Sequence, residues 1–463
     1  MSDSLNIFKS SVVYAIGNFG SKILSLALVS LFSYYLTKSE YGIYDLIITG
    51  ITFLVPVVTL QIGDAVYRNL FEITGAEERS EIISSAFGYV LVSIIICAIL
   101  FLIISVFVPF AFITEFLLLL FFSCMLPFLL QVTRGLGKKQ LYATVGIANT
   151  VALLSLCLVF LVLFKKGIYG LLIASILANC FACLLLLFKG GLLRYISFSK
   201  TKKQVVVELL KYSWPLVPNT ISWFLITMSD RFIILYWLNM DANGIFAVST
   251  KYPSLIMMVN SVFILAVQDH ALDEKSGFNS RFFNTYIRFD FTLINIFILI
   301  TPLLTRFTLS KEFYEAWKYM PLLYMSTAFM AFSSYIGAYY LKFRDTKGLF
   351  YTTIVGGIIN ILVSGGMMPF IGLYAPALGS LLSFLVMYII RYRYISKKFE
   401  VRINNKEILL LFAASVACMA ILFLNNTTGT YSLLVISLLL FFIYNKELLR
   451  YLYNNSKKLI IKK

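Results

Sequence analysis

The stretch "SEYGIYDLIITGITFLVPVVTL" (residues 39–60) turns apolar within its first two helical turns and stays so, with scattered threonines, to residue 60. A run of roughly 20 apolar residues is long enough to cross a membrane as an α-helix. Comparable runs recur from one end of the chain to the other, and the segments between them are too short to fold as soluble domains. The sequence therefore predicts an all-α, polytopic membrane protein.

About 14 transmembrane helices can be assigned to these apolar runs by length and composition. The first run is too long for the apolar core of a cleaved signal peptide, and no small-residue cleavage site follows it, so we expect a permanent span. The predicted spans are 10–37, 41–70, 82–109, 112–136, 140–164, 168–188, 207–238, 243–268, 282–304, 316–341, 348–370, 373–395, 406–424 and 430–446.

Basic residues indicate how these spans are oriented. With the N-terminus in the cytoplasm, the inner segments hold 30 of the 39 Lys and Arg residues, including "KTKK" (200–203) and "RYRYISKK" (391–398). Cytoplasmic loops of membrane proteins are enriched in Lys and Arg, so both termini are predicted to be cytoplasmic. The net charge of +17 is then explained by basic loops that face anionic lipid headgroups, and no nucleic acid partner is needed.

The opening stretch has a counterpart about 200 residues later in the chain. Two further pairs of segments match at a similar offset. The three pairs are "SEYGIYDL" (39–46) with "DANGIFAV" (241–248), "LYATVGIANTV" (141–151) with "FYTTIVGGIINIL" (350–362), and "GIYGLLIAS" (167–175) with "GLYAPALGS" (372–380). Chance similarity among apolar helices is the competing explanation, but the loops match as well as the helices.

Six predicted spans separate the copies, and because six is even, both copies have the same orientation. The predicted architecture is therefore two six-helix lobes related by pseudo-two-fold symmetry, at residues 1–200 and 201–397. Residues 398–463 add two further transmembrane helices and a basic cytoplasmic tail.

Charged residues lie deep inside three of the predicted spans. "ITMSDRFIILYWL" (226–238) contains Asp230 and Arg231, which point about 100° apart on a helix and cannot simply neutralise each other. Lys251 lies at a similar predicted depth in the next span, and Lys22 lies near the middle of the first. Ionisable residues inside a membrane segment indicate a functional site. The excess of cations predicts a wet, positively charged cavity suited to a phosphate group.

Polar residues at helical spacing extend these charged positions into stripes on the first two spans of each lobe. Such stripes would line a water-filled cleft between the lobes, although close helix packing is the alternative for the small residues. The predicted cavity-lining residues are Asn18, Ser25, Asp45, Thr49, Asn219, Trp223, Thr227 and Ser254.

Several polar residues also have a simpler interpretation. Asp230 could form a structural bridge to Lys251, which would still leave two cations for the cavity. Asp45 could be a solvated acid at the end of a helix. Asp64 and Arg68 are four residues apart on one helical face, which favours a local ion pair. The single histidine and the six cysteines are interpreted as a loop residue and as buried small side chains.

Sequence motifs for chemistry are absent. The chain has no GxxxxGK[ST] phosphate-binding loop, no nucleophile with an assembled base, and no cluster of metal ligands, so no cofactor is expected. Transport across the membrane fits these observations better than catalysis.

The chain resembles a known family over essentially its whole length. "IFKSSVVYAIGNFGSKILSLALVSLFSYYLTKSEYGIYDL" (7–46) and "PLVPNTISWFLITMSDRFIILYWLNMDANGIFAVSTKYP" (215–253) are similar to polysaccharide flippases. These flippases belong to the multidrug/oligosaccharidyl-lipid/polysaccharide exporter superfamily. The motifs that carry this resemblance are "GxxxSK" at 17–22, "SDRF" at 229–232 and the "YG…Y" after the first span.

The resemblance implies a bacterial inner-membrane protein with a V-shaped central cavity. Its substrate would be an undecaprenyl-pyrophosphate-linked oligosaccharide, moved from the cytoplasmic to the periplasmic face by alternating access for O-antigen or related polysaccharides. Lys22, Arg231 and Lys251 would line a cationic cavity with Asp230 beside them. Further implied partners are a coupling ion (proton or sodium), a polysaccharide polymerase and a chain-length regulator.

Three other functions have to be weighed against this one. A cation-coupled drug antiporter of the same superfamily would need an acid-rich cavity, whereas the excess here is basic. A membrane polysaccharide polymerase or glycosyltransferase would need acidic or Arg/His-bearing outer loops, which the chain lacks. A purely structural membrane protein does not explain three buried cations.

Overall fold

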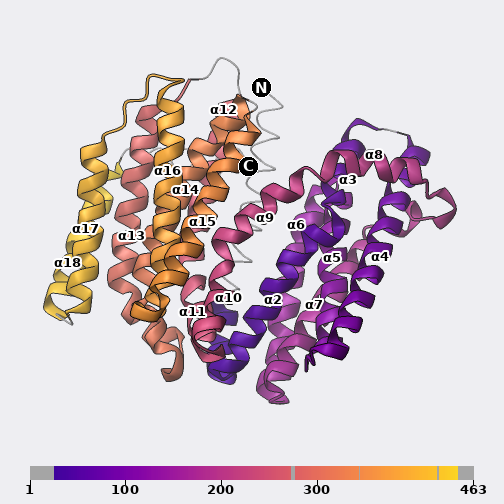
Figure 1. Ribbon diagram of the computed structural model, residues 1–463, viewed down its shortest axis with the longest axis horizontal. Helices are drawn as coiled ribbons and strands as arrows, with labels where there is room; N and C mark the ends of the chain where they lie inside the picture. The colour runs from indigo at the N-terminus through magenta and orange to yellow at the C-terminus, as the bar shows by residue number, and fades with distance from the viewer. Residues whose placement is uncertain (1–25, 74, 273–276, 344, 425–426, 447–463) are drawn as a thin grey trace, which may run out of the picture. The chain divides into compact units, whose positions relative to one another are not determined.

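The computed structural model describes residues 26–73, 75–272, 277–343, 345–424 and 427–446. Every regular element in these ranges is a helix (Figure 1). Nine of the described helices are long and apolar enough to cross a membrane, and three shorter apolar helices accompany them. The predicted all-α polytopic class is therefore confirmed. The first predicted span is described only from residue 26, and its described part includes the helix Leu26–Tyr35.

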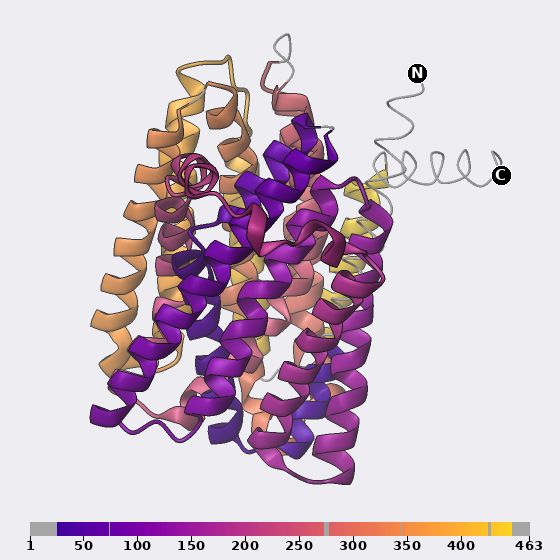
Figure 2. The same ribbon diagram turned by 90° about the vertical axis from the view of Figure 1, so that its right-hand side faces the viewer.

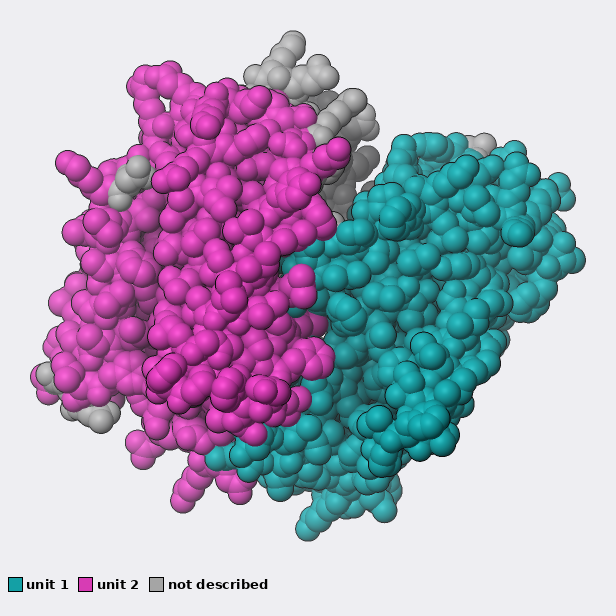
Figure 3. Space-filling view, in the orientation of Figure 1, with its two compact units in different colours: residues 1–224, 239–244 teal, residues 225–238, 245–463 magenta. Residues whose placement is uncertain are grey.

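The chain divides into two compact units, coloured separately in Figure 3. Unit 1 contains residues 1–224 and 239–244, and unit 2 contains residues 225–238 and 245–463. The predicted lobe boundaries after residues 200 and 397 stay a prediction.

Unit 1 is built from long helices that lie side by side (Figures 1 and 2). α5 packs against α3 and α7, and α6 packs against α7. The helices are α2 (Lys38–Thr59), α3 (Ile62–Glu72), α4 (Ala76–Phe107), α5 (Ile113–Gly135), α6 (Lys139–Cys157), α7 (Gly167–Phe188), α8 (Lys203–Ser213) and most of α9 (Leu216–Thr227). A π-helical stretch, Leu158–Leu163, follows α6, and two 3-10 turns, Leu192–Tyr195 and Phe198–Lys200, follow α7.

Helix α2 begins with a capping box formed by Thr37 and Glu40. The Thr37 side chain accepts from the Glu40 backbone N–H, and the Glu40 carboxylate accepts from the Thr37 backbone N–H at 2.9 Å. The same carboxylate accepts from the Ile168 backbone N–H at 3.2 Å. One acidic side chain therefore caps α2 and links its start to the start of α7.

The second predicted span is interrupted where α2 ends and α3 begins. Leu60 (φ 44°) and Gln61 (φ 54°) both adopt left-handed backbone angles, which cost a non-glycine residue of order 1–3 kcal/mol. The Thr59 hydroxyl provides hydrogen bonds to the backbone at this break. It donates to the Val55 carbonyl and accepts from the Gln61 backbone N–H. Discontinuous helices at membrane depth are tolerated where the backbone is buried in protein or lines a cavity.

The repeated segments 39–46 and 241–248 approach each other closely through their aligned glycines. The Asn243 side-chain amide donates to the Gly42 carbonyl at 2.8 Å. A Cβ atom on Gly42 would overlap the Met240 carbonyl oxygen, and one on Gly244 would overlap the Lys38 carbonyl oxygen. Only glycine allows the two backbones to cross at this distance.

Unit 2 contains a second group of closely packed helices, in which α16 lies against α14 and α15, and α13 lies against α17 and α18 (Figure 1). A 3-10 stretch, Lys311–Lys318, separates α13 from α14. The helices are α10 (Ser229–Trp237), α11 (Met240–Lys251, of which residues 245–251 lie in this unit), α12 (Pro253–Leu272), α13 (Ser280–Thr308), α14 (Met320–Lys342), α15 (Thr346–Ile371), α16 (Tyr374–Ser396), α17 (Asn405–Phe423) and α18 (Thr427–Tyr444).

Two further predicted spans are wrong as continuous helices. Residues 207–238 form three helices, α8, α9 and α10, with breaks near Pro215 and at Met228. Residues 243–268 are divided between α11 and α12 at Tyr252, directly before Pro253. Proline lacks a backbone N–H and clashes with the preceding turn, so it favours the first position of a new helix.

Candidate functional site

Asp230 lies in the first turn of α10, just after the break at Met228, and its side chain is buried. One carboxylate oxygen accepts from the Asn360 amide at 3.0 Å and from the Ser364 hydroxyl at 3.1 Å. The other oxygen accepts from the Ser380 hydroxyl at 3.3 Å. Neutral donors from α15 and α16 therefore compensate a carboxylate that burial would otherwise strongly destabilise. We call Asp230, Asn360, Ser364 and Ser380 the Asp230 cluster.

Glycines allow these helices to approach closely around the Asp230 cluster. A Cβ atom on Gly379 of α16 would overlap the Ser364 hydroxyl and would lie 2.7 Å from the Asn360 side-chain oxygen. On α15, Cβ atoms on Gly356 and Gly357 would lie 3.1 Å and 3.0 Å from side chains at the end of α9. Small residues are typical of such close contacts between membrane helices.

Arg231 is also buried, and it connects the helix break to α11. Its guanidinium donates to the Thr227 carbonyl at 3.1 Å and to the Thr250 hydroxyl at 3.3 Å. The same group lies 5.5 Å from the centre of the Phe246 ring, which is within the range of a cation–π contact. Thr227 ends α9, so its carbonyl is one that the break leaves without a helical partner. Arg231 therefore stabilises the discontinuity.

Lys251 is the last residue of α11 and lies half-buried at the second break. The hydroxyl of Ser254, the second residue of α12, donates to the Lys251 carbonyl. In the part of the chain that the structure describes, the partners of Asp230 are its cluster and the neighbouring Arg231, and Lys251 is not among them. Asp230 therefore does not form the structural bridge to Lys251 that was the alternative interpretation.

The structure describes some of the remaining predicted site residues and leaves others out. Asp45 and Thr49 lie on the buried side of α2, so the alternative of a solvated acid at position 45 is wrong. Trp223 lies half-buried in α9. Lys22, Asn18, Ser25 and the side chain of Asn219 lie outside the described residues.

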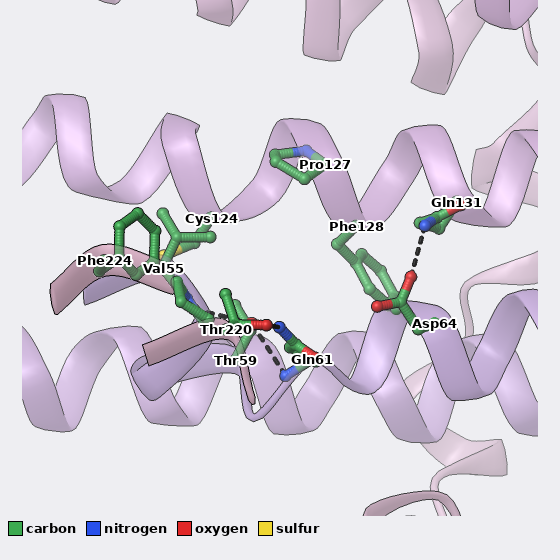
Figure 4. A pocket seen from close by; sticks show the side chains of 12 residues that line it. Val55, Thr59, Gln61, Asp64, Cys124, Pro127, Phe128, Gln131, Thr220 and Phe224 are labelled. Carbon is green, nitrogen blue, oxygen red and sulfur yellow. Dashed lines mark hydrogen bonds between the residues drawn. The ribbon is translucent and has the colours of Figure 1, made fainter. Parts of the chain in front are cut away.

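A cavity of about 270 Å³ lies in unit 1 at the break between α2 and α3 (Figure 4). The Gln61 amide donates to the Thr220 hydroxyl of α9, and the Gln131 amide of α5 donates to the Asp64 carboxylate. Cys124 also lines the cavity. The cavity walls are α2, α3, α5 and α9, and its polar groups are amides, hydroxyls and one acid.

The predicted local ion pair between Asp64 and Arg68 is wrong. Asp64 turns toward α5 and bonds to Gln131, whereas Arg68 lies over the Tyr212 ring at 4.6 Å and pairs with Glu72 at 4.0 Å. The backbone of His270 lies in the last turn of α12, so the prediction of a loop residue is wrong, and its side chain is outside the described part.

Two buried charged groups were not predicted from the sequence. Arg391 of α16 is 1% exposed, and its guanidinium donates to Thr352, Thr353 and two backbone carbonyls. Asp290 of α13 is fully buried, and neither carboxylate oxygen has a hydrogen-bond partner among the described residues. The side chain of Asn260, also fully buried, interacts with this carboxylate.

Metal coordination would require several His, Cys, Asp or Glu side chains close together. No group of three or more such residues occurs among the described residues. Buried charges and polar groups at helix breaks are suited to binding a polar or ionic ligand.

Comparison with known proteins identifies the family. A family model described as "Polysaccharide biosynthesis protein" matches residues 7–269, more than half of the chain. No curated protein sequence matches this chain.

Solved structures show the fold. A structure of the lipid II flippase MurJ in an inward closed conformation is 17% identical, with a TM-score of 0.70 over 96% of this chain and 100% of that chain. An inward-facing multidrug resistance MATE family transporter of the MOP superfamily is 11% identical, with a TM-score of 0.68 over 83% and 98%. A MATE structure in the straight conformation is 12% identical, with a TM-score of 0.56 over 84% and 96%.

At these identities the structural likeness shows the fold alone, which is that of MOP superfamily transporters. The resemblance stated from the sequence motifs is thereby confirmed. The chain is a multi-pass membrane protein that belongs to the polysaccharide biosynthesis protein family.

Proposed function

We propose that this protein is a flippase for undecaprenyl-pyrophosphate-linked oligosaccharides. It moves repeat units from the cytoplasmic to the outer face of the bacterial inner membrane by ion-coupled alternating access, for O-antigen or another surface polysaccharide. In this proposal about 14 spans form two six-helix lobes with two additional helices. A polymerase and a chain-length regulator act on the delivered units.

The observation that best supports this proposal is the position of the buried charges at interrupted helices. Asp230 and Arg231 follow the break between α9 and α10, and Lys251 precedes the break between α11 and α12. Secondary transporters bind substrates and coupling ions at such discontinuous helices. Membership of a polysaccharide biosynthesis family and the fold shared with a lipid II flippase favour a lipid-linked sugar as the substrate.

Each part of the substrate has a proposed place. The pyrophosphate binds Lys22, Arg231 and Lys251, because Arg offers two donors in one plane and Lys adds a point charge. The sugars occupy water beside Trp223 and Trp237, and the polyprenyl chain stays in lipid. The remaining proposed lining residues are Asn18, Ser25, Asp45, Thr49, Asn219, Thr227 and Ser254.

Asp230 has a distinct proposed role in ion coupling. Its carboxylate is buried among an amide and two hydroxyls, which are groups that can reorganise when a proton or sodium ion arrives. The neighbouring Arg231 gives this residue an electrostatic link to the pyrophosphate.

The leaflet in which the substrate accumulates tests this proposal. Deleting the gene from its host should cause lipid-linked oligosaccharide to accumulate in the cytoplasmic leaflet, where a membrane-impermeant periodate treatment of spheroplasts cannot oxidise it. Accumulation of oxidisable, outward-facing units would instead indicate a polymerase. Normal levels of the lipid-linked unit in the deleted strain would contradict the proposal.

A drug antiporter is the second candidate, because multidrug MATE transporters share the fold. This alternative predicts that the deleted strain becomes sensitive to cationic drugs while its surface polysaccharide is unchanged. The flippase proposal predicts the opposite pattern, so the two phenotypes measured in one strain separate the candidates.

A further inference from the structure

A basic pocket of about 770 Å³ lies where α13 begins and α18 ends. Figure 1 shows α13, α17 and α18 together at one edge of unit 2, and all three helices pack against one another. Four cationic side chains line the pocket, from α13, from the segment before α17 and from the residues after α18. They are Arg281, Arg288, Arg402 and Lys446.

Hydrogen bonds hold the segment before α17 against the start of α13. The Arg402 backbone N–H donates to the Ser280 hydroxyl at 3.0 Å, and the Asn284 amide donates to the Arg402 carbonyl at 3.0 Å. The Asn404 backbone N–H donates to the Asn284 side-chain oxygen at 3.3 Å. These three bonds fix Arg402 beside α13, so the pocket is a built feature of the fold.

Two acidic side chains pair with basic residues of this pocket. Glu407 of α17 forms a two-pronged pair with Arg288, with one of its bonds at 2.9 Å. Glu400 pairs with Arg402 at 2.7 Å, but both side chains are about four-fifths exposed, and such pairs are worth little. Among the residues that the structure describes, the lining of the pocket is therefore predominantly basic, which suits an anion.

An apolar surface borders the same pocket. Ile443, which lines it, is 67% exposed, and the preceding Phe442 is 60% exposed. Leu409 and Leu410 of α17 are similarly exposed. Exposed apolar side chains on these two helices are expected to contact lipid tails, and the pocket lies at the end of the helices that the basic loops predict to be cytoplasmic.

We propose that this pocket binds the phosphate headgroup of an anionic phospholipid of the bilayer, with its acyl chains along α17 and α18. The volume falls within the roughly 300–1,000 Å³ of small-molecule sites. Basic pockets between helices on the cytoplasmic side are suited to anionic headgroups. The site is separate from the residues assigned to transport, so the inference does not depend on the flippase proposal.

Lipid binding to the purified full-length protein tests the site. Dioleoylphosphatidylglycerol should bind more tightly than dioleoylphosphatidylcholine, as measured by native mass spectrometry and by the unfolding temperature in detergent. The double variant Arg281→Gln/Arg402→Gln should weaken phosphatidylglycerol binding about thirtyfold, since each basic residue near anionic lipid contributes about 1 kcal/mol and a tenfold change equals about 1.4 kcal/mol. Arg288 is left intact because Glu407 would lose its partner.

The matched control removes the same charge elsewhere in unit 2. Lys347 and Lys397 are both exposed, so Lys347→Gln/Lys397→Gln should leave phosphatidylglycerol binding within about twofold of the parent protein. Equal weakening in the two double variants would overturn the proposal, because the effect would then follow net charge alone. Equal affinity for the two phospholipids would also overturn it.

Two further arms keep the test decisive. Thr285→Phe should fill the pocket without changing its charge, so it should weaken binding even if the arginine variant fails to fold. Inorganic phosphate should not displace the phospholipid at equal concentration, since it lacks the acyl chains. Displacement by phosphate alone would assign the pocket to a soluble anion and contradict a lipid site.

Discussion

Single residues determine how this protein tolerates charge inside its helices. Asp230 and Arg391 are both buried, and both are surrounded by neutral oxygen and amide partners. The two residues differ in where they lie along their helices. Asp230 follows a helix break, whereas Arg391 lies within the continuous helix α16. Burial of a charge in a span is therefore a weak indication of function by itself, and the interrupted backbone beside Asp230 is the stronger one.

The Asp230 cluster should be sensitive to one added methyl group. Gly379→Ala places a Cβ atom against the Ser364 hydroxyl and the Asn360 side chain, so we expect a loss of about 1–3 kcal/mol of stability together with loss of transport. Gly365→Ala is the control, because a Cβ atom there has no neighbour within 4 Å. Thermal unfolding of the two purified variants checks this. Equal unfolding temperatures would show that the helices can separate at no cost.

Interrupted helices are the characteristic feature at the level of elements. The breaks between α2 and α3, α9 and α10, and α11 and α12 all fall inside runs that the sequence predicts as single spans. Proline explains the last of these, since Pro253 begins α12. The left-handed Leu60 and Gln61 have no such sequence signal, and tertiary bonds such as that between Gln61 and Thr220 hold them.

The crossing of the repeated segments gives a prediction for elements. Gly42→Ala should prevent α2 from reaching its position against the start of α11, because the new Cβ atom would overlap the Met240 carbonyl. We expect the level of folded protein in the membrane to fall severalfold, as measured by fluorescence-detected size-exclusion chromatography. Gly50→Ala in the same helix meets no atom within 4 Å and should behave as the parent protein. Equal levels of the two variants would contradict the close crossing.

For the whole molecule, hydropathy and charge predict the class but not the local geometry. Apolar runs identify an all-α membrane protein, and the motifs at 7–46 and 215–253 identify the family. The partners of Asp230 could not be predicted, because Asn360, Ser364 and Ser380 lie more than 100 residues away on other spans. Ser and Asn on apolar helices are common packing residues, and only contact in the fold distinguishes these three.

The central claim is that buried basic groups at interrupted helices bind the lipid-linked pyrophosphate. Surface polysaccharide in cells that express Arg231→Gln/Lys251→Gln as the sole copy tests it most directly, with the amount of protein in the membrane measured alongside. Arg306→Gln/Lys311→Gln removes the same charge from exposed positions and serves as the control. We predict that the first variant reaches the membrane but yields at most about 1% of the parent polysaccharide, since each lost charge-assisted contact costs about 1.5–3 kcal/mol, while the control is normal. Normal polysaccharide from a well-expressed Arg231→Gln/Lys251→Gln protein would contradict the claim.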